Sequence, residues 1–146
     1  MFRLFRPTQF CDPTLGPLER ARGRWRGKVL VDGKQLPLAL VGGRDQPDAE
    51  ALAVAKQLPI IWRSCQESVK RSLVEHLEPY LEALGEDARA TDLWQFVALI
   101  SASVVPLGGK LVAEIALSSS WDEEHVLGAR FDGPKFVELN GSIVPE

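Results

Sequence analysis

Hydrophobic and polar residues alternate in the first third of the chain, which predicts a β-hairpin. The alternation runs from Trp25 to Val31 and resumes over residues 36–40, and Asp32-Gly33 between them is typical of a two-residue hairpin turn. Pro37 has no amide hydrogen to donate, so we expect it on an edge strand or with its nitrogen pointing outward. The hairpin is predicted over residues 24–42.

The pattern then changes to a helical period. Asp45-Gln46-Pro47-Asp48 offers a capping residue and a proline suited to a first turn. At 100° per residue one apolar stripe follows, formed by Ile61, Cys65, Val69, Leu73, Leu77, Tyr80 and Leu84. Pro59 should kink or restart the helix, and Gly85 should end it. We predict a helical layer over residues 47–84 that lies on one face of a sheet.

Short alternating segments separated by turn residues return in the last third of the chain. A helical turn can begin within residues 93–98, and four strands are expected after it. These strands are Leu99–Val105, Leu111–Leu117, His125–Phe131 and Lys135–Leu139. They predict a four-stranded antiparallel meander over residues 94–141.

The resulting order, ββα(α)ββββ, contains no repeated βαβ unit. It predicts an α+β fold with an antiparallel sheet of about six strands, namely the N-terminal hairpin and the C-terminal meander, and with one or two helices packed on one face. A chain of 146 residues has the usual size of one domain. We therefore expect a single domain over residues 1–146, in which residues 1–17 form an extended N-terminal segment.

The composition is 45% hydrophobic and 25% charged, which is ordinary for a soluble globular protein. No apolar run reaches the roughly 20 residues that cross a bilayer, and the first residues lack the features of a secretory signal. We expect a cytoplasmic protein without a membrane segment, a metal or a cofactor. Cys11 and Cys65 are too few for a disulfide framework or a four-cysteine zinc site. We therefore expect two reduced thiols, and a single disulfide between them is the alternative.

Charge is distributed unevenly along the chain, whose net charge is −3. Residues 1–34 hold eight Lys and Arg against three acids, whereas the other 112 residues hold nine against seventeen. The basic residues Arg20, Arg22, Arg24, Arg26 and Lys28 alternate strictly, so one extended strand would place them on one face. This basic stripe is able to neutralise phosphates, or it is a solvated face balanced by acids on a neighbouring strand. The acidic chain and the lack of interleaved aromatic residues on that face argue against nucleic acid.

The most conspicuous candidate site is an acidic turn. It comprises Trp121, Asp122, Glu123, Glu124 and His125. Carboxylates and an imidazole are the groups of a general acid/base pair or of a hard-cation site, but this spacing matches no catalytic or metal motif. The other histidine, His76, falls on the edge of the helical stripe and is interpreted as a boundary residue.

The same turn also has a purely structural interpretation. Ser120 with Glu123, or Ser119 with Asp122, fits a capping box at a short helical turn. His125 has the strand parity of the apolar residues that follow it, so it can point inward and bond a neighbouring carboxylate. We rank the structural corner first, a partner or ligand surface second, and catalysis third.

Several short motifs resemble a known group of proteins. They are Phe10-x-Asp12-Pro13-x-Leu15-Gly16-x-Leu18, Trp25-x-Gly27, Trp121-Asp122-x-Glu124-His125-x-Leu127-Gly128 and Gly141-Ser142-Ile143-Val144. The chain is similar in these motifs to small bacterial α+β domains of unknown function that share this opening and the final hairpin motif. Similar small α+β domains serve as immunity proteins in toxin systems, so the resemblance implies a protein-binding role.

The sequence therefore favours a small, non-enzymatic domain that binds another protein, whose identity and oligomeric state the sequence leaves open. Acidic side chains suit a basic partner, because opposite charge speeds association. The first alternative is a hydrolase or metal-dependent enzyme that uses Asp122 to His125. The second is nucleic-acid binding through Arg20 to Lys28.

Overall fold

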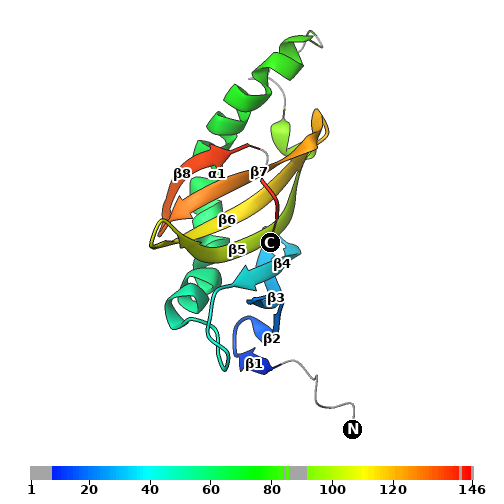
Figure 1. The fold of residues 1–146 in the computed structure, drawn as a ribbon. Coiled ribbons are helices and arrows are strands. Elements are labelled where there is room, and N and C mark those ends of the chain that lie inside the picture. Colours follow the sequence, from blue (N-terminus) through cyan, green and yellow to red (C-terminus); the bar gives the residue numbers. More distant parts are fainter. Residues whose placement is uncertain (1–7, 84, 86–91, 142, 146) are drawn as a thin grey trace.

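The computed structural model describes residues 8–83, 85, 92–141 and 143–145. Within them the chain forms one long helix, one 3-10 turn and a single eight-stranded sheet whose strand order follows the chain (Figure 1). The elements are β1 (Gln9–Asp12), β2 (Gly16–Ala21), β3 (Arg24–Val31), β4 (Lys34–Leu40), α1 (Ala49–Ala83), η2 (Leu93–Gln95), β5 (Val97–Leu107), β6 (Lys110–Ser119), β7 (Asp122–Asp132) and β8 (Lys135–Asn140).

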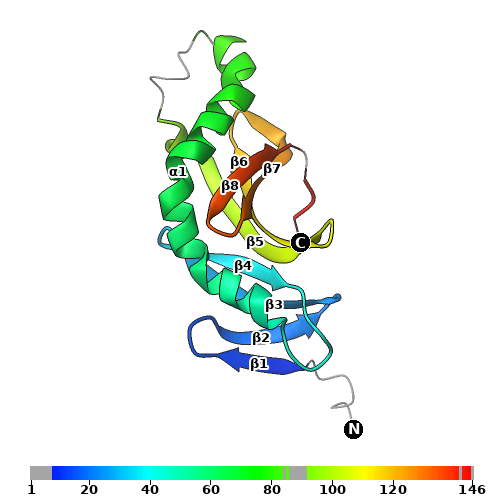
Figure 2. The same ribbon diagram turned by 90° about the vertical axis from the view of Figure 1, so that its left-hand side faces the viewer.

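The prediction of about six strands with one or two helices was wrong. The described residues hold eight strands and a single long helix, so the protein is mostly sheet, although it keeps an α+β architecture dominated by antiparallel pairs. The two additional strands, β1 and β2, include residues that were expected to be an extended segment. Their short, proline-interrupted sequences carry little alternation. Helix α1 continues through Pro59 and Pro79 and is curved rather than divided in two (Figure 2).

One connection distinguishes this sheet from a simple meander. β4 and β5 pair in parallel, from Leu38↔Ala102 to Leu40↔Val104, whereas all other neighbours are antiparallel. A parallel pair requires the chain to return across the sheet, and α1 makes that crossover. β4 is thus an interior strand. Pro37 is tolerated there because pairing with β5 begins one residue later, at Leu38.

The predicted β3–β4 hairpin and the four-stranded meander of β5 to β8 are present. Asp32 and Gly33 both have positive φ, 52° and 78°, as the two-residue turn between β3 and β4 requires. In the part of the chain that the structure describes, no helix is long and apolar enough to span a membrane. Cys11 is exposed and Cys65 is buried, and both are free thiols.

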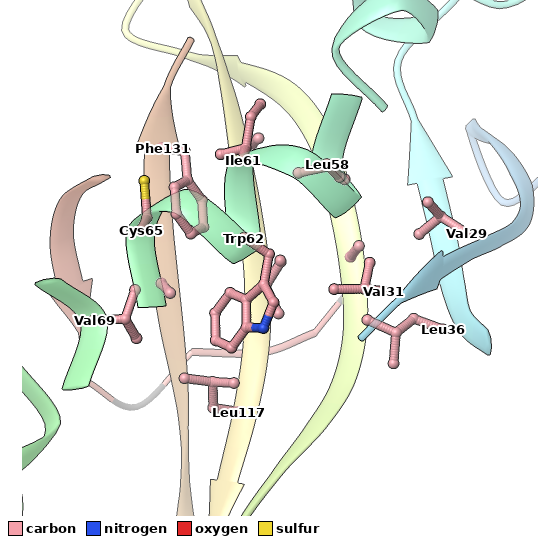
Figure 3. Packing of buried hydrophobic residues seen from close by; sticks show 14 of the residues in the cluster. Val29, Val31, Leu36, Leu58, Ile61, Trp62, Cys65, Val69, Leu117 and Phe131 are labelled. Atoms are coloured by element: carbon pink, nitrogen blue, oxygen red, sulfur yellow. The ribbon is translucent and has the colours of Figure 1, made fainter. Parts of the chain in front are cut away.

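Helix α1 covers one face of the sheet, which we call the inner face. Asp48 caps its first turn, since Oδ2 accepts a hydrogen bond from the Ala51 amide at 2.9 Å. The predicted stripe is buried from Ile61 to Leu77. Beyond Leu77 the buried residue is Leu81, whereas the predicted Tyr80 is exposed. Leu84 lies outside the described residues. Trp62 packs between helix and sheet, with its ring centroid 6.5 Å from that of Phe131 (Figure 3).

A buried carboxylate fastens the β1–β2 hairpin to α1. Asp12 Oδ2 accepts hydrogen bonds from the amides of Thr14 and Leu15 at 2.8 and 2.9 Å, and Oδ1 lies 2.8 Å from Lys56 Nζ on α1. Burial alone would raise the pKa of Asp12, but the Lys56 ammonium and the two amides outweigh it and hold that pKa below its ordinary value. The charged carboxylate therefore stabilises the turn and its contact with the helix.

Replacing Asp12 by Asn tests this contact. The substitution removes charge-assisted hydrogen bonds, so the free energy of unfolding at neutral pH should fall by about 1.5–3 kcal/mol, measured by urea denaturation. Since the folded-state pKa of Asp12 is depressed, its contribution is present above the unfolded value of about 3.9 and is lost as the pH falls through the folded value. D12N should therefore lose less stability than the wild type on acidification.

Asp45→Asn, at an exposed position, is the matched control and should change the free energy of unfolding little. Equal losses of stability in the two variants would contradict the assignment.

Candidate functional site

The acidic turn is the tip of the β6–β7 hairpin. Ser119 pairs with Asp122, leaving Ser120 and Trp121 as the two turn residues, and Ser119 Oγ accepts a hydrogen bond from the Trp121 amide at 3.1 Å. The Ser120 amide donates to the carbonyl of Phe96 at 3.0 Å, which ties the tip to the start of β5. The predicted capping box and short helical turn were wrong, because the ladder of β6 and β7 runs directly into the turn.

Asp122 is buried, with 7% of its surface exposed, and both histidines of the chain approach it. Its Oδ1 lies 2.7 Å from His125 Nδ1, and its Oδ2 lies 3.5 Å from His76 Nε2. His76 stands one helical turn before Tyr80 on α1, and their ring centroids are 6.4 Å apart. One carboxylate from the sheet is thus shared by polar side chains from the hairpin and from the helix.

These contacts change the protonation equilibria of the cluster. The hydrogen bond with His125 holds the pKa of Asp122 below its ordinary value despite burial, and Tyr80 and His76 act in the same direction. The same bond with Asp122 raises the pKa of His125, and interaction with Asp122 raises the pKa of Tyr80. Asp122 is therefore a carboxylate that stays ionised beside an imidazole that holds its proton more strongly than usual.

The second histidine contact is weaker than the first. His76 Nε2 and Asp122 Oδ2 are both buried, and at 3.5 Å they form no hydrogen bond with each other or with other described residues. The two imidazoles approach different oxygens of a single carboxylate. Among the described residues, no group of three or more His, Cys, Asp or Glu side chains could hold a metal ion.

Sequence reasoning found Asp122 and His125 but separated them from His76. His125 was interpreted as pointing inward and bonding a neighbouring carboxylate; its side chain is instead 44% exposed, and the carboxylate that it bonds is Asp122, three residues earlier. His76 was interpreted as a boundary residue of the helix. The available signal was its spacing from Tyr80, since residues four apart on a helix share a face, but nothing local indicates which strand that face meets.

The other side of the tip is aromatic and acidic. Trp121 is partly buried and packs on Phe96, with ring centroids 4.7 Å apart, while Phe96 is 44% exposed. Beside them is a hollow of about 410 Å³ that Glu123 helps to line. Glu123 and Glu124 are exposed, and neither forms an ion pair with a residue that the structure describes.

The five residues of the basic stripe do not share a face. The chain turns at Arg22 and Gly23, whose φ values are 52° and 76°, so the stripe is divided between two strands. Arg20 is the cross-strand neighbour of Trp25 on the inner face, and its guanidinium donates a hydrogen bond to the Gly42 carbonyl oxygen at 3.3 Å. Arg24, Arg26 and Lys28 remain together on the opposite, outer face of β3. The extended phosphate-binding strand proposed from the alternation is therefore absent from this region.

Titration of His125 by NMR checks the Asp122 contact. The pKa of His125 should lie above its ordinary value of about 6.5 and should return toward that value in Asp122→Asn, because the neutral amide no longer favours the imidazolium. Since the folded-state pKa is raised, the stability that the pair contributes is fully present below the unfolded value and is lost as the pH rises through the folded one. Identical His125 titrations in the two proteins would refute this account.

No protein-family model, curated protein or solved structure matches this chain. The geometry of the chain itself therefore carries the functional argument, and the hairpin tip with its buried Asp122 and exposed aromatic and acidic residues is the candidate site.

Proposed function

We propose that this chain is a non-enzymatic cytoplasmic domain that binds a basic protein partner, in the manner of an immunity protein, through the tip of the β6–β7 hairpin. The contact surface comprises Phe96, Trp121, Glu123, Glu124 and His125, and we call it the tip surface. The observation that carries the proposal is an aromatic pair at the surface directly beside two exposed carboxylates, neither of which forms an ion pair with a described residue.

The aromatic pair has the character of a binding anchor. Trp and Tyr dominate the energetically important positions of protein interfaces, because a large rigid ring buries much apolar area at little entropic cost. Trp121 is already held in place by its contact with Phe96 and by the hydrogen bond of its amide to Ser119. A partner that covers Phe96 would therefore gain apolar contact without having to order the indole.

The acidic residues near the tip are not explained by stability. Helix α1 ends at the same end of the molecule (Figure 1), and its last turns carry Glu78 and Glu82 but no basic residue in the final turn. The C-terminal end of a helix bears partial negative charge, so carboxylates there are unfavourable. Negative charge therefore gathers at this end of the molecule although the helix end disfavours it. Such a surface suits a basic partner, because opposite charge accelerates association.

The test is capture of the partner from the native host with charge-reversed variants. The wild type should retain one stoichiometric basic protein, and Glu123→Lys combined with Glu124→Lys should abolish its retention. A matched control, Asp45→Lys combined with Glu67→Lys, changes the net charge equally at exposed positions away from the tip and should retain the partner. Association with the purified partner should slow as salt is added.

Two outcomes would contradict the proposal. One is capture that survives reversal of Glu123 and Glu124, which would place the interface elsewhere. The other is capture of no stoichiometric partner by a wild-type protein that is shown to be folded. Trp121→Ala separates the aromatic contribution from the charge. It should raise the dissociation rate of the complex and leave the salt dependence of association nearly unchanged.

A second candidate function, hydrolysis, is favoured by the Asp122–His125 pair. A buried carboxylate that orients an imidazole through Nδ1 leaves Nε2 to accept a proton, and the His125 side chain is 44% exposed. If the chain is a hydrolase, His125→Asn should reduce turnover of an activated ester by roughly 100-fold or more while the fold is retained. Turnover that is unchanged in this variant, or indistinguishable from buffer in the wild type, excludes it.

A further inference from the structure

The pairing of β2 with β3 ends halfway along β3. It runs from Ala21↔Arg24 to Glu19↔Arg26, whereas β3 continues to Val31 and pairs with β4 over that whole length. Among the described residues, none pairs with Gly27–Val31 on the side that faces β2. Strand amides and carbonyls point alternately to the two sides, so this half of β3 retains a free hydrogen-bonding edge inside the sheet.

The ladder between β2 and β3 ends beside Pro17 and Gly27. A Cβ atom at Gly27 would lie 2.3 Å from Leu18 Cδ2 and 3.1 Å from the carbonyl oxygen of Pro17, so β2 still lies close to β3 at this point and the Leu18 side chain fills the space that a Cβ would occupy. Leu18 is completely buried, and Pro17 has no amide hydrogen to offer a ladder. The Asp12–Lys56 contact fixes the adjoining β1–β2 turn to α1.

A hollow of about 680 Å³ lies beside the residues at which this ladder ends. Leu15 and Pro17 line one side of it, and Arg26 and Lys28 line the other. Its one carboxylate, Glu19, accepts a hydrogen bond from the Gln9 side chain at 3.0 Å. The hollow is thus apolar on the side of the β1–β2 loop and cationic on the outer face of β3.

We infer that the edge of β3 over Gly27–Val31 accepts an extended acidic segment of another protein as an additional strand. Backbone hydrogen bonds would supply the pairing, and alternate side chains would supply the specificity. One set of side chains would lie on the inner face beside Val29 and Val31 and should be apolar. The other set would lie on the outer face beside Arg26 and Lys28 and should be acidic, which defines a strand of alternating apolar and acidic residues.

This second surface is independent of the tip surface. It lies toward the other end of the molecule, among the strands of the N-terminal half (Figure 2), and it takes the opposite charge. The part of the predicted basic stripe that remains on one face, Arg24 to Lys28, belongs to this region. Success or failure of the capture experiment on the tip surface therefore does not decide this inference.

The experiment uses the full chain and a capped six-residue peptide in which Val alternates with Glu. We expect the peptide to bind and to slow amide hydrogen exchange within Gly27–Val31. The same peptide N-methylated on alternate amides keeps its charge and apolar residues but cannot form the ladder, and it should not bind. Lys28→Glu should weaken binding by roughly two- to fivefold, whereas Lys135→Glu, an exposed control on β8, should not.

The remaining outcomes overturn the inference. The inference is wrong if the Val-Glu peptide does not bind at millimolar concentration. It is also wrong if the N-methylated peptide, or a peptide in which Val alternates with Lys, binds as tightly as the Val-Glu peptide. Binding of a single-stranded oligonucleotide that Lys28→Glu abolishes, without binding of the peptide, would instead identify this face of β3 as a nucleic-acid surface.

Discussion

The apolar stripe of α1 is the constraint on which the rest of the structure depends. A single layer of eight strands has one face that must be kept from water, and in the described chain one helix of 35 residues covers it. Burial of a large apolar side chain contributes about 1.5–3 kcal/mol, and ten residues of α1 are buried along this stripe. The parallel pairing of β4 with β5 follows from the same constraint, because the chain must cross the sheet to lay the helix over it.

Polar contacts of different strength then link the helix to a buried aspartate near each end of the sheet. Near its beginning, Lys56 meets Asp12 in the β1–β2 turn, and near its end, His76 meets Asp122 in the β6–β7 turn. Both aspartates are buried, and both have a pKa below the ordinary value because their partners favour the ionised form. The Asp12–Lys56 ion pair and the longer His76–Asp122 contact add to the apolar packing of the helix at two separate points along the sheet. The candidate site is thus one of two anchors, and its ordered geometry has a structural cause.

Local periodicity was sufficient to predict the elements that depend on it. The helical stripe, the β3–β4 hairpin and the meander from β5 to β8 follow from alternation, turn residues and a 3.6-residue period. The β1–β2 hairpin was missed because its two strands are short and carry little alternation, although the Asp12 side chain holds the turn through local hydrogen bonds. The basic stripe was misassigned because Arg22 adopts a positive φ that non-glycine residues seldom take. His76 and Asp122 were not joined because their contact depends on how α1 crosses the sheet.

The free edge of β3 differs in kind from the two outer edges of the sheet. β1 is only four residues long. β8 begins with a lysine, and its pairing shifts register opposite Arg130 and Phe131. Each of these features discourages the addition of a further strand. The edge over Gly27–Val31 is longer than β1 and regularly paired on its other side. Its outer face carries the exposed Lys28, whose positive charge would repel a second copy of the same strand but not an acidic one. An edge guarded only by charge is closed to self-association and open to a partner of opposite sign.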